Sequence, residues 1–279
     1  MQAQLIADSG ATKCDWILLG GQKAKKFTTQ GISPYFLSPD EITALLQNKV
    51  IPQLKGAEIE AVHFYGTGLS LPANQKILKQ VLRRQFKKSA LEVSTDMVGA
   101  ARALCGREKG IACILGTGSN SCYFNGKKII RNSPGIGYIL GDEGSGAYLG
   151  KKLVQYYLYD TMEEPLRTAF ERRFHQQRAD ILECVYKKPL ANRYLASLAI
   201  FLAENRGHYM VENILEDGFR DFFHQHLFSY KEIRSVPIHF TGSIAFGFKD
   251  VLQELCKHYE LKLGKIIKTP LQGLVEYHT

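Results

Sequence analysis

The chain has 279 residues, of which 45% are hydrophobic and 23% charged, a balance typical of a globular protein of one large or two ordinary domains. No apolar run approaches the roughly 20 residues needed to cross a bilayer, so we expect no membrane span and no membrane partner. The formal net charge is +9, but the basic residues form no known nucleic-acid-binding module, which argues against a nucleic-acid partner.

The cysteines predict the cellular compartment. They are scattered without a C-x-x-C pair, and most lie inside apolar runs. The six positions are Cys14, Cys105, Cys113, Cys122, Cys184 and Cys256. This pattern favours small buried side chains in a reducing cytoplasm over disulfides, zinc or an iron–sulfur cluster. The first eight residues are a short apolar run with an acidic end and predict a first strand, not a signal peptide.

The first half of the chain alternates predicted strands and helices, which indicates an α/β fold. The predicted strands span 4–7, 14–19, 23–27, 60–65 and 91–93. The predicted helices span 39–48, 74–88 and 97–105, the last of them preceded by cap oxygens at 94–96.

The second half opens with strands at 111–115, 121–124 and 127–131, and Asn125-Gly126 predicts a type I′ hairpin turn between the last two. A mostly helical stretch follows from 149 to 228. A strand at 237–240, a helix to Tyr259, a strand at 265–267 and a helix at 270–277 complete the chain. The Phe/Tyr-rich run at 219–230 is expected in the core or at a dimer interface.

The two halves resemble each other. Aligning Gly10 with Gly118 superposes a strand, a glycine loop, a return strand and a Lys-rich third strand in each half. We interpret this self-similarity as an internal duplication, which predicts two related domains.

The first glycine loop has groups suited to a metal–phosphate ligand. Asp8 ends a strand, and its carboxylate is the kind of oxygen ligand that Mg²⁺ favours. Gly10 allows close approach of a phosphate, and Thr12, Lys13 and backbone N–H groups are donors. A β-hairpin with a polar turn would have the same composition, so this loop alone leaves both interpretations open.

The second loop, Gly116-Thr117-Gly118-Ser119-Asn120, has the same character without the acid. Ser121 replaces the third glycine of a dinucleotide-binding turn, and a strand follows where that turn needs a helix. Gly242 and Ser243 lie between a strand and a helix, whose N-terminus could face a nucleotide or could simply be a strand-to-helix turn.

Two acidic positions are candidates for chemistry on a substrate. Asp96 lies where a short strand meets a helix and could act as a general base, although an N-cap aspartate has the same position. The stretch Gly141-Asp142-Glu143-Gly144-Ser145-Gly146 combines two acids with three glycines, which suits hydrogen bonds to sugar hydroxyls. His224 and His226 lack convincing ligand spacing and are expected on the surface or packed.

Three segments carry a resemblance to a known family. The segments 8–13, 114–120 and 138–146 resemble the signatures of N-acetylglucosamine kinases in the BadF/BadG/BcrA/BcrD ATPase family. The resemblance covers nearly the whole chain in the same order. It implies two ribonuclease-H-like domains, residues 1–104 plus 269–279 and residues 105–268, with ATP and Mg²⁺ in a cleft between them.

The resemblance also implies roles for single residues. Asp8 corresponds to the metal-side acid and Asp96 to the catalytic aspartate. The nucleotide would contact Ser9, Gly10, Thr12, Lys13, Gly116, Thr117, Gly118, Ser119, Gly242 and Ser243. The sugar would contact Gly66, Thr67, Gly68, Asn120 and Asp142. Ser33 stands where the family often has the Asn of an Asn-Pro pair, a departure that leaves the sugar undetermined.

The leading hypothesis is therefore a cytoplasmic, homodimeric kinase that phosphorylates the 6-hydroxyl of N-acetylglucosamine or N-acetylmuramic acid with ATP. The alternatives are a reductase-activating ATPase of the same wider family and a nucleotide-dependent regulatory module. The activator would need exposed, paired cysteines for an iron–sulfur cluster, and the sequence has no convincing pair.

Overall fold

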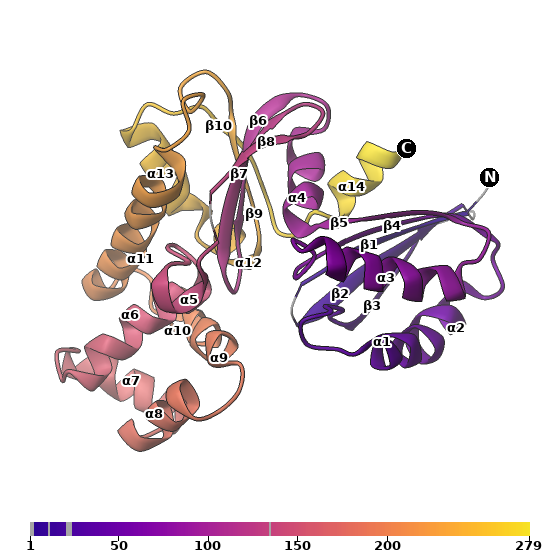
Figure 1. Cartoon of the computed structure of the whole chain (residues 1–279). Coiled ribbons are helices and arrows are strands. Elements are labelled where there is room, and N and C mark those ends of the chain that lie inside the picture. The colour runs from indigo at the N-terminus through magenta and orange to yellow at the C-terminus, as the bar shows by residue number, and fades with distance from the viewer. Residues whose placement is uncertain (1–2, 11, 21–23, 134) are drawn as a thin grey trace. The chain divides into compact units, whose positions relative to one another are not determined.

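The computed structural model describes residues 3–10, 12–20, 24–133 and 135–279. Contacts divide the chain into two compact units, Met1–Arg107 with Pro270–Thr279 and Glu108–Thr269. The resemblance placed the corresponding domain boundaries at 104/105 and 268/269. Each unit is built around one five-stranded sheet (Figure 1).

The sheet of the first unit has the order β3-β2-β1-β4-β5. Its strands are β1 (Ala3–Ser9), β2 (Lys13–Leu19), β3 (Lys25–Gln30), β4 (Ile59–Gly66) and β5 (Ala90–Thr95). The first three strands are antiparallel neighbours, whereas β4 runs parallel to both β1 and β5. The carboxyl ends of β1, β4 and β5 therefore meet at one edge, where Asp8, the 66–68 turn and Asp96 follow.

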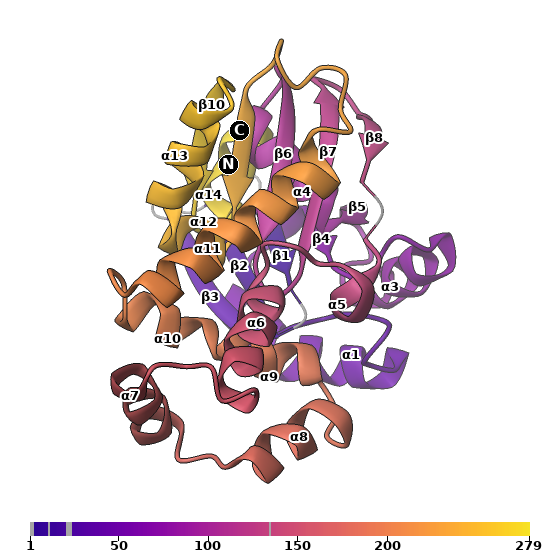
Figure 2. The same ribbon diagram turned by 90° about the vertical axis from the view of Figure 1, so that its left-hand side faces the viewer.

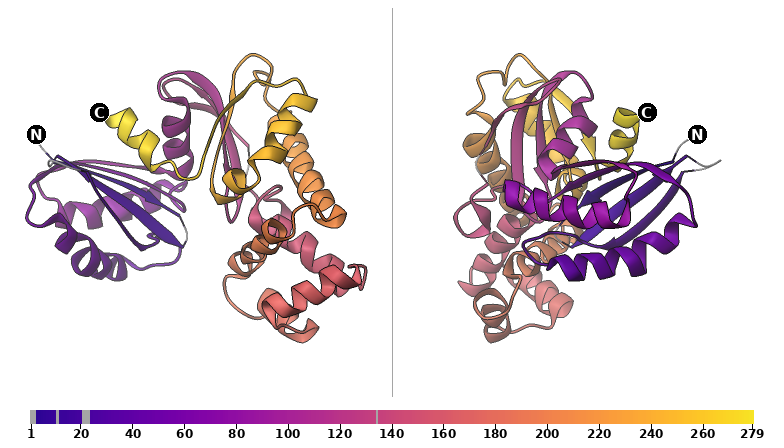
Figure 3. Two further views of the ribbon diagram at one scale, coloured as in Figure 1. Left: turned by 180° about the vertical axis from the view of Figure 1, so that it is seen from behind. Right: turned by 45° about the vertical axis from the view of Figure 1, so that its right-hand side comes forward.

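Helices cover both faces of this sheet (Figures 1 and 3). The helices are α1 (Pro39–Leu45), the π-helical η1 (Leu46–Val50), α2 (Ile51–Leu54), α3 (Pro72–Gln85), α4 (Asp96–Cys105) and α14 (Leu271–His278). Leu5 and Ala7 share one core with Ile42 of α1 and Leu78 of α3. The opposite face carries α4 and α14, which pack on each other and on β1. The terminal helix α14 therefore belongs to the first unit.

The sheet of the second unit has the order β10-β9-β6-β7-β8. Its strands are β6 (Lys109–Leu115), β7 (Ser119–Asn125), β8 (Ile129–Asn132), β9 (Ile238–Thr241) and β10 (Leu263–Ile267). Here β6, β7 and β8 are antiparallel neighbours and β9 is parallel to β6 and β10. Read from β8 to β10, this repeats the order and directions of the first sheet. The predicted α/β fold with two related domains is confirmed.

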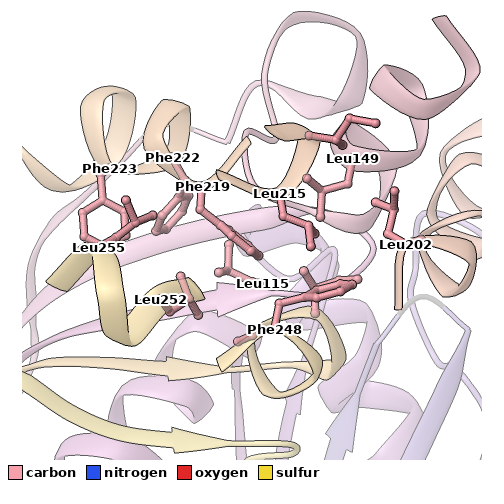
Figure 4. Packing of buried hydrophobic residues seen from close by; sticks show 14 of the residues in the cluster. Leu115, Leu149, Leu202, Leu215, Phe219, Phe222, Phe223, Phe248, Leu252 and Leu255 are labelled. Atoms are coloured by element: carbon pink, nitrogen blue, oxygen red, sulfur yellow. The ribbon is translucent and has the colours of Figure 1, made fainter. Parts of the chain in front are cut away.

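The second unit has a larger helical part, some of which packs on its sheet while the rest extends beyond one end of the strands (Figure 2). The helices are α5 (Gly137–Leu140), α6 (Gly146–Leu158), α7 (Glu164–Phe174), α8 (Arg178–Tyr186), α9 (Ala191–Ser197), α10 (Ala199–Glu204), α11 (Tyr209–Phe222), the π-helical η2 (Phe223–Leu227), α12 (Ser243–Gly247) and α13 (Lys249–His258). Phe219, Phe222 and Phe223 lie beside Leu252 and Leu255 of α13 in one buried cluster (Figure 4). The aromatic run at 219–230 therefore contributes to the core.

Several predicted boundaries shift. The first helical segment continues to Leu54, and α3 ends at Gln85 because the Arg83 guanidinium binds the carbonyls of Phe86, Lys87 and Ser89. The third strand spans Lys25–Gln30, and residue 23 of the predicted strand lies outside the described residues. The helix predicted up to Tyr259 is two helices, α12 and α13.

The predicted type I′ turn at Asn125-Gly126 is wrong, although the hairpin is present. A type I′ turn needs a positive φ at both central residues, and Gly126 has one (φ 90°) whereas Asn125 does not. Asn125 is instead the first residue of the turn, and its side-chain oxygen accepts the N–H groups of Lys127 and Lys128. This local hydrogen bonding takes the place of the left-handed asparagine.

The expectation that most cysteines are small buried side chains agrees with the structure, where five of the six are buried and Cys184 is partly buried. Across the residues that the structure describes, no helix has the length and apolar character that a membrane span requires.

The core of the second unit gives a stability prediction. Phe219 is fully buried, so Phe219→Ala is expected to destabilise the protein by about 3–5 kcal/mol through lost burial and an unfilled cavity. Tyr186, which is 80% exposed, is the matched control, and Tyr186→Ala should change stability by less than about 0.5 kcal/mol. Urea unfolding measures both, and equal effects of the two substitutions would contradict this packing.

Candidate active site

The first glycine loop joins β1 to β2, and two carboxylates, Asp8 and Asp15, face each other across these strands. Asp8 and Asp15 are directly opposed in the antiparallel pair β1–β2. Asp15 accepts hydrogen bonds from Lys13 Nζ at 2.7 Å and Thr28 Oγ1 at 2.9 Å. The Gly10 N–H donates to the Lys13 carbonyl at 2.9 Å and closes the turn. The sequence interpretation missed Asp15, which the two-residue alternation of β2 could have placed opposite Asp8.

Asp8 has a strongly perturbed ionisation. Its pKa is raised to about 7, first by burial and then by the negative charges of Asp96 and Asp15, whereas the positive charge of Lys13 opposes the shift. A poorly solvated carboxylate beside two other acids favours a bound proton or a bound cation. Carboxylate oxygens are the ligands that Mg²⁺ prefers, so the residues present fit this ion.

Asp96 begins α4, but it is not the helix cap. The cap is Thr95, whose side-chain oxygen accepts the Val98 N–H at 3.2 Å. The Asp96 carboxylate accepts the Met97 N–H at 2.8 Å, and burial raises its pKa above the ordinary value. The interpretation of Asp96 as a simple N-cap therefore loses its support.

The predicted sugar-contact segments of the first unit lie together beside Asp8. The Ser9 hydroxyl exchanges hydrogen bonds with the backbone of Ile32, donating to its carbonyl at 3.0 Å and accepting its N–H at 2.8 Å. The Ser9 carbonyl accepts the Thr67 N–H at 2.9 Å. Gly68 lies so close to Ser33 that an added Cβ would come within 2.3 Å of the Ser33 hydroxyl. Ser9 thus ties the Ser33 and 66–68 segments to the end of β1.

The second glycine loop is anchored to the start of α6. The Gly116 carbonyl accepts the Gly146 N–H at 2.8 Å, and the Thr117 carbonyl accepts the Ala147 N–H at 3.1 Å. Ser119 and Asn120 lie in β7 and not in the loop. Within the described residues, the Ser119 and Thr241 hydroxyls are buried without a hydrogen-bond partner. Unpaired buried hydroxyls at the loop and beside Gly242 fit a site completed by a polar ligand.

The glycines of these loops divide into two kinds. Gly242 is required by packing, because its φ is +121° and an added Cβ would lie 2.1 Å from the Leu115 carbonyl. Gly116 has no such constraint, since its φ is ordinary and nothing lies within 4 Å of an added Cβ. At Gly10 an added Cβ would make only an ordinary contact, 3.6 Å from the Lys13 carbonyl. At Gly10 and Gly116, a side chain would not collide with the rest of the protein. The absence of a side chain there is therefore not required by packing, and it suits a ligand that approaches the backbone closely.

Asp142 reaches the second glycine loop from the acidic segment. Its backbone is left-handed, with φ 58°, and its carbonyl accepts the Ser145 N–H at 3.1 Å. Its carboxylate accepts a long hydrogen bond of 3.5 Å from the Ser119 N–H and lies against Gly118, where an added Cβ would approach it to 3.0 Å. Burial raises the pKa of Asp142, which the Ser119 N–H opposes. The structure therefore brings Asp142, Gly118 and Ser119 together.

A buried network behind Asp142 was missed by the sequence interpretation. His226 is 4% exposed and uses both ring nitrogens, with Nε2 3.0 Å from Glu143 Oε2 and Nδ1 2.8 Å from the Ser133 hydroxyl. It lies in the π-helical turn η2, and the expectation of a packed histidine is met. Glu143 is thereby fixed, and with it the loop that carries Asp142. Nothing in the spacing of 133, 143 and 226 could have indicated this cluster.

Two units that repeat one topology, each with a glycine loop after its first strand, define the sugar kinase, actin and heat-shock ATPase fold. A glucokinase of the ROK family from Streptomyces griseus, solved with glucose and AMPPNP, shares it with a TM-score of 0.58 and 15% identity, over 99% of this chain and 97% of that chain. The predicted ribonuclease-H-like fold of the two domains is confirmed.

A closer relation defines the family. The crystal structure of the putative N-acetylglucosamine kinase of Porphyromonas gingivalis is 41% identical and superposes with a TM-score of 0.94, covering 100% of this chain and 98% of that chain. The chain therefore belongs to the N-acetylglucosamine kinase-like family of sugar kinases.

A curated relative, the N-acetylmuramic acid/N-acetylglucosamine kinase of Clostridium acetobutylicum, is 25% identical over 197 residues. That match spans 66% of this chain and 64% of the relative. No family model matches the sequence.

The two kinds of glycine give a paired prediction. Gly242→Ala should cost about 2–4 kcal/mol of stability, because a side chain there is strained and collides with backbone. Gly116→Ala should leave stability within about 0.5 kcal/mol of wild type but weaken binding of a fluorescent ATP analogue by about tenfold or more. Urea unfolding and fluorescence titration measure the two quantities. Wild-type nucleotide affinity in Gly116→Ala would contradict a phosphate contact at this loop.

The raised pKa of Asp8 predicts a pH dependence of stability. The folded protein keeps a proton on Asp8 up to about pH 7, whereas the unfolded chain releases it near the ordinary aspartate pKa of 3.8. Stability should therefore fall as pH rises from about 4 to 7, and Asp8→Asn should remove this loss, gaining roughly 1–3 kcal/mol at pH 8. Thermal unfolding from pH 4 to 8 measures it. A difference between variant and wild type that does not change with pH would contradict the assignment.

Proposed function

We propose that the protein transfers the γ-phosphoryl group of ATP to the 6-hydroxyl of an amino sugar, N-acetylglucosamine or N-acetylmuramic acid. The observation that carries the proposal is Asp96, a partly buried carboxylate with a raised pKa at the start of α4, in the same unit as Asp8 and the segments around Ser33 and Gly68. The names of the relatives from Porphyromonas gingivalis and Clostridium acetobutylicum support the substrate class.

The chemical step needs a base and an acceptor held in place. Asp96 accepts the proton of the sugar hydroxyl as its oxygen attacks the γ-phosphorus, and the bond to the β-phosphate oxygen breaks to release ADP. A pKa raised toward neutrality makes Asp96 a better proton acceptor than an ordinary exposed aspartate. The hydrogen bond from the Met97 N–H favours one rotamer of the Asp96 side chain. Less conformational entropy is then lost when the carboxylate is oriented toward the sugar hydroxyl.

The charge that develops on the phosphates must be balanced. Asp8 would hold Mg²⁺, with Asp15 adding negative potential across the β1–β2 pair, and the bound ion would neutralise phosphate oxygens. Gly10, Thr12 and Lys13 of the first unit are proposed phosphate contacts, and Lys13 would exchange its bond to Asp15 for one to phosphate.

The second unit is proposed to supply further nucleotide contacts. Gly116, Thr117, Gly118 and Ser119 offer backbone N–H groups and hydroxyls, one of which, Ser119 Oγ, is buried without a partner within the described residues. Gly242 and Ser243 begin α12 and are proposed to contact the nucleoside part. Ser9, in contrast, has its hydroxyl engaged with Ile32, so its proposed role is to position the loop.

Each unit, taken by itself, has polar groups that are proposed to contact the sugar. Asp142 and Asn120 offer oxygen and amide groups to sugar hydroxyls, and the Gly66-Thr67-Gly68 turn offers backbone groups. Ser33 is 2% exposed and its hydroxyl accepts the Tyr35 N–H at 3.3 Å, so little of its side chain is open to a sugar. The identity of the sugar therefore depends more on the 66–68 turn and Asp142 than on Ser33.

The reductase-activator alternative is disfavoured by the buried thiols. A cluster shared by two subunits needs exposed cysteines, and five of the six are buried. A regulatory module without a small substrate would not need the acids at 96 and 142. The homodimer and the cytoplasmic location remain predictions.

The test is a coupled ADP-release assay against amino sugars and plain hexoses, with product analysis for the 6-phosphate. We expect turnover that depends on N-acetylglucosamine or N-acetylmuramic acid, and a loss of about 10²-fold or more in kcat for Asp96→Asn. Nucleotide affinity should be unchanged in this variant, because Asp96 acts on the acceptor.

Asp40→Asn is the matched control, since Asp40 is an exposed acid in the first turn of α1, and it should retain wild-type turnover. Near-wild-type turnover in Asp96→Asn would contradict the catalytic assignment. ATP hydrolysis that is the same with every sugar would favour the activator or the regulatory module.

A further inference from the structure

A cluster of metal-ligating side chains lies in the first unit, on residues that the proposed reaction does not use. His63 lies on β4, Glu92 on β5 and His278 on α14. One potential ligand atom from each residue lies within 4.8 Å of the other two. All three side chains are partly buried, and His278 reaches the cluster from the end of the chain.

The spacing is close to that of a metal site. His63 Nδ1 lies 3.0 Å from Glu92 Oε2, and the His63 and His278 rings are stacked with centroids 3.7 Å apart. Bonds of about 2.0–2.1 Å to a tetrahedral zinc ion place neighbouring ligand atoms about 3.3–3.4 Å apart. The His63–Glu92 separation is thus near that edge length, and His278 offers a ring nitrogen within 4.8 Å of both atoms.

Neighbouring residues hold the three candidate ligands in orientation through hydrogen bonds. The Tyr65 hydroxyl lies 2.8 Å from His278 Nε2, so a neighbour fixes that ring. Arg102 donates to Glu92 Oε1 and, at 2.5 Å, to the Tyr65 hydroxyl. Glu92 therefore uses one oxygen for Arg102 and presents the other to His63. Hydrogen-bonded partners of this kind hold ligands in orientation at metal sites.

We propose that His63, Glu92 and His278 form a zinc site that fastens the C-terminal helix α14 to the sheet of the first unit. Two imidazoles and one carboxylate suit Zn²⁺, with a water as fourth ligand, whereas Mg²⁺ prefers oxygen ligands alone. The ion would replace the hydrogen bond between His63 and Glu92. The guanidinium of Arg102 beside the site lowers the affinity relative to a site without it.

A zinc ion that fixes α14 would also affect α4, because the two helices pack closely on each other. Gly273 of α14 lies so close to α4 that an added Cβ would come within 2.3 Å of the Ala103 carbonyl. Arg102 belongs to the same helix, and Tyr65 packs against Gly99, where an added Cβ would lie 2.9 Å from the Tyr65 side chain. Zinc at the cluster would therefore stabilise the pair α4–α14, and the inference stands whether or not the proposed reaction is correct.

The experiment uses the full chain, stripped with chelator and kept free of nucleotide. Titration with Zn²⁺ should show about one ion bound per chain by calorimetry and a rise of the thermal midpoint by several degrees. Cobalt(II) in place of zinc should give the intense visible absorption of a tetrahedral ion. Failure of zinc to bind, or a cobalt spectrum typical of six oxygen ligands, would overturn the proposal and leave the cluster as a hydrogen-bonded network only.

Variants locate the ion. His63→Gln with His278→Gln should abolish zinc binding and the thermal shift, with circular dichroism confirming that the variant is folded. His175→Gln, at an exposed histidine, and Asp8→Asn, at the proposed magnesium site, should both retain zinc binding. If the double variant does not fold, the cobalt spectrum of the wild type still decides. Full zinc binding in the folded double variant would place the ion elsewhere.

Discussion

The first unit depends on keeping a poorly solvated carboxylate at the end of β1. Ionised Asp8 is unfavourable there, because burial removes hydration and Asp96 and Asp15 repel it. The surrounding loops are nevertheless fixed by backbone hydrogen bonds through Ser9 to Ile32 and Thr67. A site that holds acids together while its frame remains rigid retains unfavourable electrostatic free energy, which a bound cation can release.

The two glycine loops share one topology, but only the first has an acid within the duplicated strand and loop. Under the alignment that joins the two halves, Gly116 corresponds to Asp8, so the second copy has a glycine where the first has its buried carboxylate. Its acid, Asp142, comes from the segment after β8 and reaches the loop beside Gly118. One chain topology thus supplies two chemically different loops, one suited to a cation and one that offers N–H groups and hydroxyls.

The sequence predicts the strands and helices well where a pattern is local. Apolar runs ending at Asp8 and Leu115 and the repeat around Gly10 and Gly118 are visible without any fold, and Asp96 is marked by the strand–helix junction. Within the first unit, the proximity of Asp8 to Asp96 follows from the parallel strands β1, β4 and β5, whose carboxyl ends meet at one sheet edge. The extension of the first helix to Leu54 and the turn at Asn125 depend on side-chain hydrogen bonds and packing, which periodicity does not encode.

The networks that support the acids could not be read from spacing. His226 meets Glu143 across 83 residues and Ser133 across 93, and Tyr65 meets His278 across 213. Each contact depends on the register of strands and on which face of a helix is buried, so the fold must be known first. The same holds for the glycines: composition marks Gly10, Gly116 and Gly242 alike. Only the atoms around each Cα separate a glycine that the fold requires from one that leaves room for a ligand.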